Sequence, residues 1–125
     1  MERSASSQHP ARSVVLATHG MVATSQPLAS AAALGVLREG GNAVDASIAA
    51  AAVLNVVEPM MTGIGGDMFA LLFMQEDGRP VGLNGSGWSG SKATMEHLKT
   101  HAIANLEGIQ TVTVPGVVAG WFKLH

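Results

Sequence analysis

The chain opens with a polar segment and reaches its first apolar runs after residue 13. Residues 1–13 contain four Ser, two Arg and one His and no apolar stretch, which predicts a flexible lead-in and argues against a secretory signal peptide. Residues 14–17 and 21–25 are short runs typical of β-strands, and His19 with Gly20 predicts a turn between them. We therefore expect the folded part of the chain to span residues 14–125.

A first helix is predicted from Pro27, because proline is tolerated in the first helical turn. The spacing of apolar and small residues places one face of this helix on Leu28, Ala31, Ala32 and Gly35. Gly40 and Gly41 predict its end, since glycine accepts the left-handed conformation that helix C-caps often need.

A second helix is predicted over residues 43–57, with Asn42 as its N-cap and Asp45 in its first turn. The segment is apolar nearly all round and rich in alanine, which is typical of a buried helix with closely approaching neighbours. Pro59 predicts where it stops.

A strand is expected over residues 67–75, after a glycine-rich elbow at residues 62–66. Both faces of this strand are apolar, so we expect a sheet that is covered on both sides. Asp77 with Gly78 is a signal for a two-residue hairpin turn, and residues 81–84 would form the partner strand. Pro80 cannot donate to a ladder and is expected at an edge or a bulge.

The remainder alternates loops with short elements. Residues 85–90 form a Gly- and Ser-rich loop that carries Trp88, and Thr94 is expected to cap a short helix through Lys99. Residues 111–114 are predicted to be a strand, and Pro115 with Gly116 to open a helix that continues to His125. A helix interrupted at the end of the chain suggests a fragment of a longer protein.

Composition supports the same interpretation. Of the 125 residues, 47% are hydrophobic and 13% are charged, so much of the surface is expected to be buried against something outside this sequence. The net charge of −2 argues against binding to nucleic acid or an anionic membrane. There are no cysteines, which excludes disulfides and thiol catalysis. No apolar run is long enough for a transmembrane helix, so we predict a soluble, cytoplasmic protein.

Several motifs invite a chemical interpretation that their context weakens. Residues 63–66 resemble a phosphate-binding loop, but they lack the Lys of that motif and lead into a strand, so a tight turn is preferred to a nucleotide site. His97 and His101 have the spacing of zinc ligands, but without a third ligand a solvated helix face is the better interpretation. We expect neither a metal nor a cofactor.

The loop at residues 85–90 is the best candidate for a binding site. Neither Ser86 nor Ser89 has the glycine spacing of a nucleophile elbow, and an ordinary surface loop is the simplest alternative. A Trp among glycines and hydroxyls directly after a hairpin is nevertheless typical of places where ligands are held. Asp45 is interpreted as a helix cap, whereas Asp67 has no assigned role.

Six short segments then occur in one order from residue 20 to the end of the chain. They are residues 20–30 (GMVATSQPLAS), 40–46 (GGNAVDA), 57–59 (VEP), 62–66 (TGIGG), 113–116 (TVPG) and 119–121 (AGW). Together they resemble the early large subunit of the gamma-glutamyltranspeptidase family. The resemblance implies an α+β fold, the αββα sandwich of the N-terminal nucleophile hydrolases, of which this chain would be only a part.

The resemblance also implies a precursor that cleaves itself. The new N-terminal threonine of the small subunit is then the nucleophile, and its own amine can serve as base. No residue of this chain corresponds to that threonine, so no catalytic residue is expected here. The small subunit from the same precursor would be the partner, and the substrate would be a small-molecule amide or γ-glutamyl compound.

In the family, an arginine of the large subunit grips the α-carboxylate of the γ-glutamyl group, which suits a bidentate guanidinium. The matching stretch here places Asn84 at the family's Asp and Ser86 at the arginine, and a shift by two places Trp88 there instead. These three residues are our candidate substrate-binding residues. We predict an amidohydrolase with altered acyl specificity, similar to oxamate amidohydrolases or acylases. The alternatives are a true γ-glutamyl transferase or glutathione hydrolase, and an inactive truncated structural module.

Overall fold

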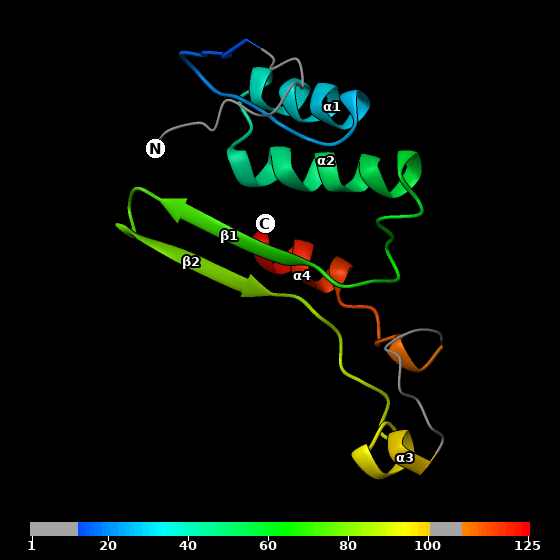
Figure 1. Ribbon diagram of the computed structural model, residues 1–125. Coiled ribbons are helices and arrows are strands. Elements are labelled where there is room, and N and C mark those ends of the chain that lie inside the picture. Colours follow the sequence, from blue (N-terminus) through cyan, green and yellow to red (C-terminus); the bar gives the residue numbers. More distant parts are fainter. Residues whose placement is uncertain (1–12, 101–108) are drawn as a thin grey trace, which may run out of the picture.

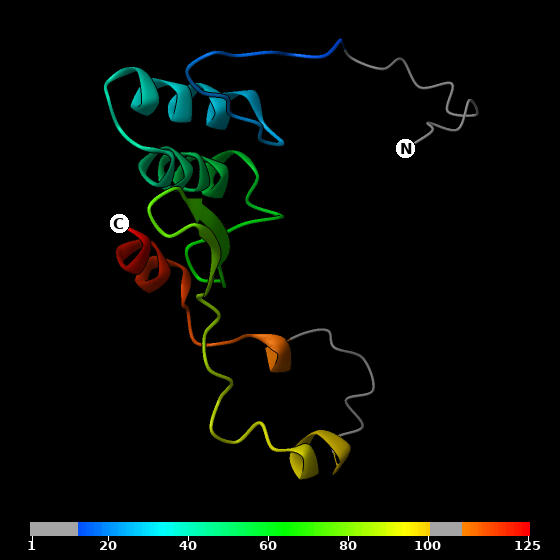
Figure 2. The same cartoon turned by 90° about the vertical axis from the view of Figure 1, so that its left-hand side faces the viewer.

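The computed structural model describes residues 13–100 and 109–125. Two helices, α1 (Pro27–Arg38) and α2 (Ala43–Val57), lie side by side, and a hairpin of β1 (Phe69–Met74) and β2 (Arg79–Asn84) lies beyond α2 (Figures 1 and 2). Helix α4 (Val117–Leu124) lies beside the hairpin and contacts β2. The short helix α3 (Met95–Thr100) stands apart from these layers, and a 3-10 turn, η1 (Ile109–Thr111), precedes the segment that leads to α4.

The pair of α1 and α2 is held together by alanines. Ala29 and Ala33 of α1 and Ala46 and Ala50 of α2 are buried and form one cluster. The face shared by Leu28, Ala31, Ala32 and Gly35 is therefore not the one that packs against α2, since Leu28 is 59% exposed. Both faces of α1 have helical spacing, and the small side chains at Ala29 and Ala33 are the ones that let α2 approach closely.

The connection between the two helices follows the prediction. Gly40 has a φ of 93°, and its N–H donates to the Leu37 carbonyl while the Gly41 N–H donates to the Val36 carbonyl. These two bonds form a Schellman motif, which satisfies carbonyls at the end of α1. Asn42 then caps α2 through its side-chain oxygen, and the Asn42 N–H donates to the Asp45 Oδ2 at 3.3 Å.

Helix α2 ends before Pro59, as predicted, but it is not buried all round. Only Ala46 and Ala50 are buried on this helix, and Val56 is 78% exposed. The reason is that, among the described residues, α1 is the element that packs closely against α2, and it covers one face of that helix. The expectation of an all-round buried helix is thus wrong for the described residues.

The hairpin is present, with Phe69 paired to Asn84 and Met74 to Arg79. Its loop is residues 75–78, so the connection has four residues where two were predicted, and Gly78 supplies the positive φ of 60°. Strand β2 begins before Pro80, which pairs opposite Phe73 at an open edge.

One face of β1 is uncovered, contrary to the expected two-sided cover. The exposed fractions of Phe69, Leu71 and Phe73 are 71%, 80% and 68%. Ala70 and Leu72, on the other face, are half-buried. The described residues therefore leave a large apolar surface open, in keeping with the low proportion of charged residues.

Three predicted strands do not form. Residues 14–17, 21–25 and 111–114 belong to no sheet, because the described part of the chain offers them no strand to pair with. Thr94 does cap α3 by accepting a bond from the His97 N–H at 3.2 Å. The helix predicted after Gly116 is present as α4.

Across residues 13–100 and 109–125, no helix is long and apolar enough to cross a bilayer. The same residues hold no group of three His, Cys, Asp or Glu side chains that could bind a metal ion. Of the histidine pair considered above, His97 lies on α3 and His101 lies outside the described residues.

Candidate functional site

The Gly- and Ser-rich loop at residues 85–90 begins as a continuation of the hairpin. The Gly85 N–H donates to the Met68 carbonyl at 2.8 Å, and the Met68 N–H donates to the Gly85 carbonyl at 3.4 Å. This pair of bonds extends the ladder by one position beyond Phe69 and Asn84. The loop therefore leaves the sheet from a defined position, and its first residues are held by main-chain contacts.

Asp67 links this loop to the segment before α4 through hydrogen bonds. Its Oδ1 accepts a hydrogen bond from the Gly87 N–H at 2.9 Å and another from the Thr113 hydroxyl at 2.8 Å. The bond from Gly87, and after it the bond from Thr113, lowers the pKa of Asp67 below its ordinary value, because both stabilise the ionised carboxylate. Asp67, which had no role from sequence alone, is thus a structural link between segments far apart in the chain.

The loop and the segment before α4 also touch through their backbones. The Val114 N–H donates to the Trp88 carbonyl at 2.9 Å, a ladder-like bond in the segment predicted to be a strand. A Cβ atom on Gly87 would overlap the Val114 carbonyl oxygen, so this close approach requires glycine.

The elbow at residues 63–66 supports the start of α4 and shows no feature of a phosphate site. The Gly66 carbonyl accepts bonds from the Gly116 N–H at 3.0 Å and the Val117 N–H at 3.1 Å. These are N–H groups at the N-terminal end of α4, the kind that would otherwise be available to an anion. The preference for a tight turn over a nucleotide site agrees with this arrangement.

Asn84 and Ser86 form a local turn. The Asn84 Oδ1 accepts bonds from the Ser86 N–H at 2.9 Å and from the Ser86 hydroxyl at 2.6 Å. The hydroxyl proton of Ser86 is therefore committed, and the groups that remain for a ligand are the Asn84 Nδ2 hydrogens and the lone pairs of Ser86. Trp88 is 86% exposed, so it is placed on the surface of the loop.

A cavity of about 270 Å³ brings the three candidate residues together with the first turns of α4. Its lining comprises Leu83, Asn84, Gly85, Ser86, Gly87, Trp88, Val114, Pro115, Gly116, Ala119, Gly120 and Lys123. Sequence analysis found the loop but missed Lys123, which is the one charged residue in this lining. The signal was present, since Gly116, Gly120 and Lys123 have the i, i+4, i+7 spacing of one helix face.

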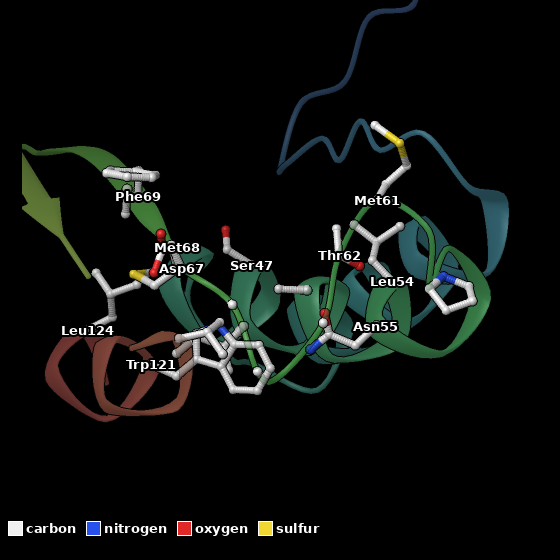
Figure 3. Close-up of a pocket in the computed structure, with 18 of the residues that line it drawn as sticks. Ser47, Leu54, Asn55, Met61, Thr62, Asp67, Met68, Phe69, Trp121 and Leu124 are labelled. Carbon is white, nitrogen blue, oxygen red and sulfur yellow. The ribbon is translucent and has the colours of Figure 1, made fainter. Parts of the chain in front are cut away.

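A larger cavity of about 580 Å³ lies between α2 and α4, and Asp67 is part of its lining. Asn55 of α2 and Trp121 of α4 extend toward each other there (Figure 3). The Asn55 Nδ2 and Thr62 Oγ1 atoms are buried and have no hydrogen-bond partner among the described residues. Ser47 also lines this cavity, and its hydroxyl donates to the Ala43 carbonyl at 2.7 Å. The hydroxyl is therefore not paired with a general base, as a nucleophile would be.

Comparison with known proteins identifies the class of protein to which this arrangement belongs. The family model for gamma-glutamyltranspeptidase matches residues 29–125, and the chain belongs to that family. The oxamate amidohydrolase proenzyme of Klebsiella pneumoniae is 45% identical over 109 residues, which cover 86% of this chain and 20% of that protein. The acylase ACY 1 proenzyme of Pseudomonas sp. (strain SE83) is 38% identical over 115 residues, covering 83% of this chain and 20% of that protein.

Solved structures agree. The cephalosporin acylase from Bacillus halodurans has a TM-score of 0.79 and 45% identity, covering 99% of this chain and 24% of that one. The gamma-glutamyltranspeptidase of Helicobacter pylori has a TM-score of 0.77 and 33% identity, covering 90% of this chain and 33% of that one. The α+β fold prediction is confirmed, as part of the αββα sandwich of N-terminal nucleophile hydrolases. The chain spans about a fifth of the length of the curated relatives it matches.

Proposed function

We propose that these residues form the early large-subunit part of a self-cleaving amide hydrolase or acyl transferase. Several relatives are named proenzymes, which supports maturation by cleavage. The nucleophile would be the N-terminal threonine of a small subunit from the same precursor, with its own amine as base. That threonine would attack the amide carbonyl, release the amine, and leave an acyl-enzyme for water or another acceptor to resolve.

The apolar surface of this chain supports a partner of that kind. Phe69, Leu71 and Phe73 form an exposed row on β1, and Val56 of α2 is also exposed. An open patch of this sort is typical of an interface rather than of a free-standing surface. In the proposed enzyme the rest of the precursor covers it.

The geometry at Ser86 supports an acyl specificity other than γ-glutamyl. On the register inferred from the sequence, Ser86 would stand where the family has the arginine that grips the substrate α-carboxylate, and a shift by two would place Trp88 there. Neither a serine nor a tryptophan can provide a bidentate, charge-assisted contact. The Ser86 hydroxyl is already bonded to the Asn84 Oδ1 at 2.6 Å. This observation carries the proposal that the enzyme acts on other amides, as the names of the oxamate amidohydrolase and acylase relatives suggest. Asn84 and Trp88 would shape the acyl pocket.

The test is a substrate comparison with the full-length protein expressed from its own reading frame. We expect hydrolysis of oxamate or related simple amides to exceed that of γ-glutamyl-p-nitroanilide. Ser86→Arg should raise kcat/KM for the γ-glutamyl substrate about tenfold or more, since charge-assisted bonds contribute roughly 1.5–3 kcal/mol. Ser89→Arg, in the same loop, is the matched control and should change it little. Brisk γ-glutamyl transfer by the unchanged protein would contradict the proposed specificity.

Two alternatives remain under test in the same experiment. A true γ-glutamyl transferase or glutathione hydrolase is favoured by the 39% identity to glutathione hydrolase 2 of Arabidopsis thaliana. An inactive structural module would show a reading frame that ends near His125 and no turnover of any amide. For an enzyme of the proposed kind, we infer a cytoplasmic location and small-molecule amides as substrates.

A further inference from the structure

Lys123 supplies the positive charge in the cavity beside the Gly- and Ser-rich loop. The other residues of that lining are apolar, glycine or neutral polar. An isolated cation in an otherwise uncharged pocket is most useful when the ligand brings the negative charge. We propose that Lys123 binds a carboxylate on the acyl group of the substrate, so that the preferred substrates are anionic half-amides. This inference rests on the proposed amide hydrolase function and adds a binding residue and a substrate class to it.

The packing of α4 sets where Lys123 lies. A Cβ on Gly116 would lie 2.9 Å from the Gly87 nitrogen and 3.0 Å from the Ser86 carbonyl carbon. These distances show that the start of α4 rests directly on the loop backbone. Lys123 follows two turns later on the same face, and its long stem can carry the ammonium group over the loop.

The charges of the described residues leave Lys123 free for a ligand. No ion pair joins Lys123 to another described residue. The ion pair that the described residues do form is between His125 Nδ1 and Asp45 Oδ1, at 3.1 Å. The Asp67 carboxylate accepts hydrogen bonds from the Gly87 N–H and the Thr113 hydroxyl. Asp67 also lines the larger cavity and is not part of the lining that holds Lys123.

The neutral groups of the pocket favour the same kind of ligand. Because the Asn84 Oδ1 accepts both bonds from Ser86, the Asn84 side chain has donors left and its acceptor is engaged. A lysine ammonium is donor-only as well. Two donor groups in one small cavity match a ligand rich in acceptors, and a carboxylate next to an amide carbonyl meets that requirement.

The experiment measures equilibrium binding to the full-length protein by calorimetry. The probes are two half-amides, oxamate and succinamate, and their neutral counterparts, oxamide and succinamide. Lys123→Met should weaken binding of the half-amides about tenfold to a hundredfold, as expected for the loss of a charge-assisted contact. Binding of the neutral diamides should stay within about twofold. Lys123→Arg should retain most of the affinity, and Lys92→Met, an exposed lysine outside this lining, is the matched control.

The results separate this inference from the proposed function. Three results would overturn the role of Lys123: no binding of the half-amides, half-amide binding equal to diamide binding, or half-amide binding unchanged in Lys123→Met. An acidic side chain elsewhere in the protein that pairs with Lys123 would give one of these results. Turnover of the same four compounds tests the hydrolase itself. Lys123-dependent binding without turnover would support the binding site and contradict the amide hydrolase function. Turnover that is unchanged in Lys123→Met would support the amide hydrolase function and contradict the role of Lys123.

Discussion

Replacing Gly87 by alanine would place a methyl group against the backbone before α4. A Cβ on Gly87 overlaps the Val114 carbonyl oxygen and lies 2.6 Å from the Val114 carbonyl carbon. Carbon atoms in ordinary contact are about 3.5 Å apart or more, so the two segments must separate by about 0.9 Å at that carbon and by more at the oxygen. The neighbour is main chain, which cannot rotate away as a side chain could.

The free-energy cost follows from two contributions. Forcing extra atoms into a packed contact costs about 1–3 kcal/mol. Separating the segments also breaks the bond from the Val114 N–H to the Trp88 carbonyl, which contributes about 0.5–1.5 kcal/mol. Together Gly87→Ala should destabilise this contact by about 2–4 kcal/mol, which is roughly a thirtyfold to thousandfold increase in local opening.

The assay is amide hydrogen exchange of the full-length protein, read by mass spectrometry on peptides that contain Val114. Exchange there should accelerate in Gly87→Ala by the factor given above, because opening exposes the Val114 N–H. Gly90→Ala is the matched control, since nothing lies within 4 Å of a Cβ at Gly90 and no positive φ is recorded there. Exchange in Gly87→Ala within about threefold of the unchanged protein, or equal acceleration in Gly90→Ala, would refute the reasoning.

The other predictions concern the helix end and the carboxylate link. Gly40→Ala should destabilise the protein by about 1 kcal/mol or somewhat more, because φ is 93° there, whereas Gly35→Ala inside α1 should stabilise it by about 0.5–1 kcal/mol; equal effects in urea unfolding would contradict this. The lowered pKa of Asp67 means that its contribution to stability is present above the unfolded pKa of about 3.9 and is lost as the pH falls through the folded pKa. Asp67→Asn should therefore show a weaker fall in melting temperature between about pH 5 and pH 2, and parallel curves for the two proteins would disprove the link.

Local features of this fold could be predicted from the sequence because their causes are local. The left-handed Gly40, the Asn42 cap with Asp45, and the stop before Pro59 each depend on residues within one turn of each other. The glycine-rich character of residues 85–90 likewise predicted a loop, which the structure has there. The ordered series of short segments identified the family that the comparisons show.

Pairings across the chain required the tertiary structure. An apolar helix such as α1 offers several faces with helical spacing, and only the position of α2 selected Ala29 and Ala33 over Leu28. Residues 111–114 have a strand-like composition, but a strand needs a partner strand, and the bond from the Val114 N–H to the Trp88 carbonyl does not make a ladder.

The candidate site shows the same division. Asn84, Ser86 and Trp88 lie within five positions of each other, so sequence pattern sufficed to group them. Asp67 precedes this loop in the chain and reaches it through the hydrogen bond from the Gly87 N–H. Lys123 follows the loop in the chain and lines the same cavity. The sequence by itself determined the turns, the caps and the family, since these depend on residue type and short spacing. Only the fold decided which distant charges meet the loop, because that depends on how α4 packs against the hairpin.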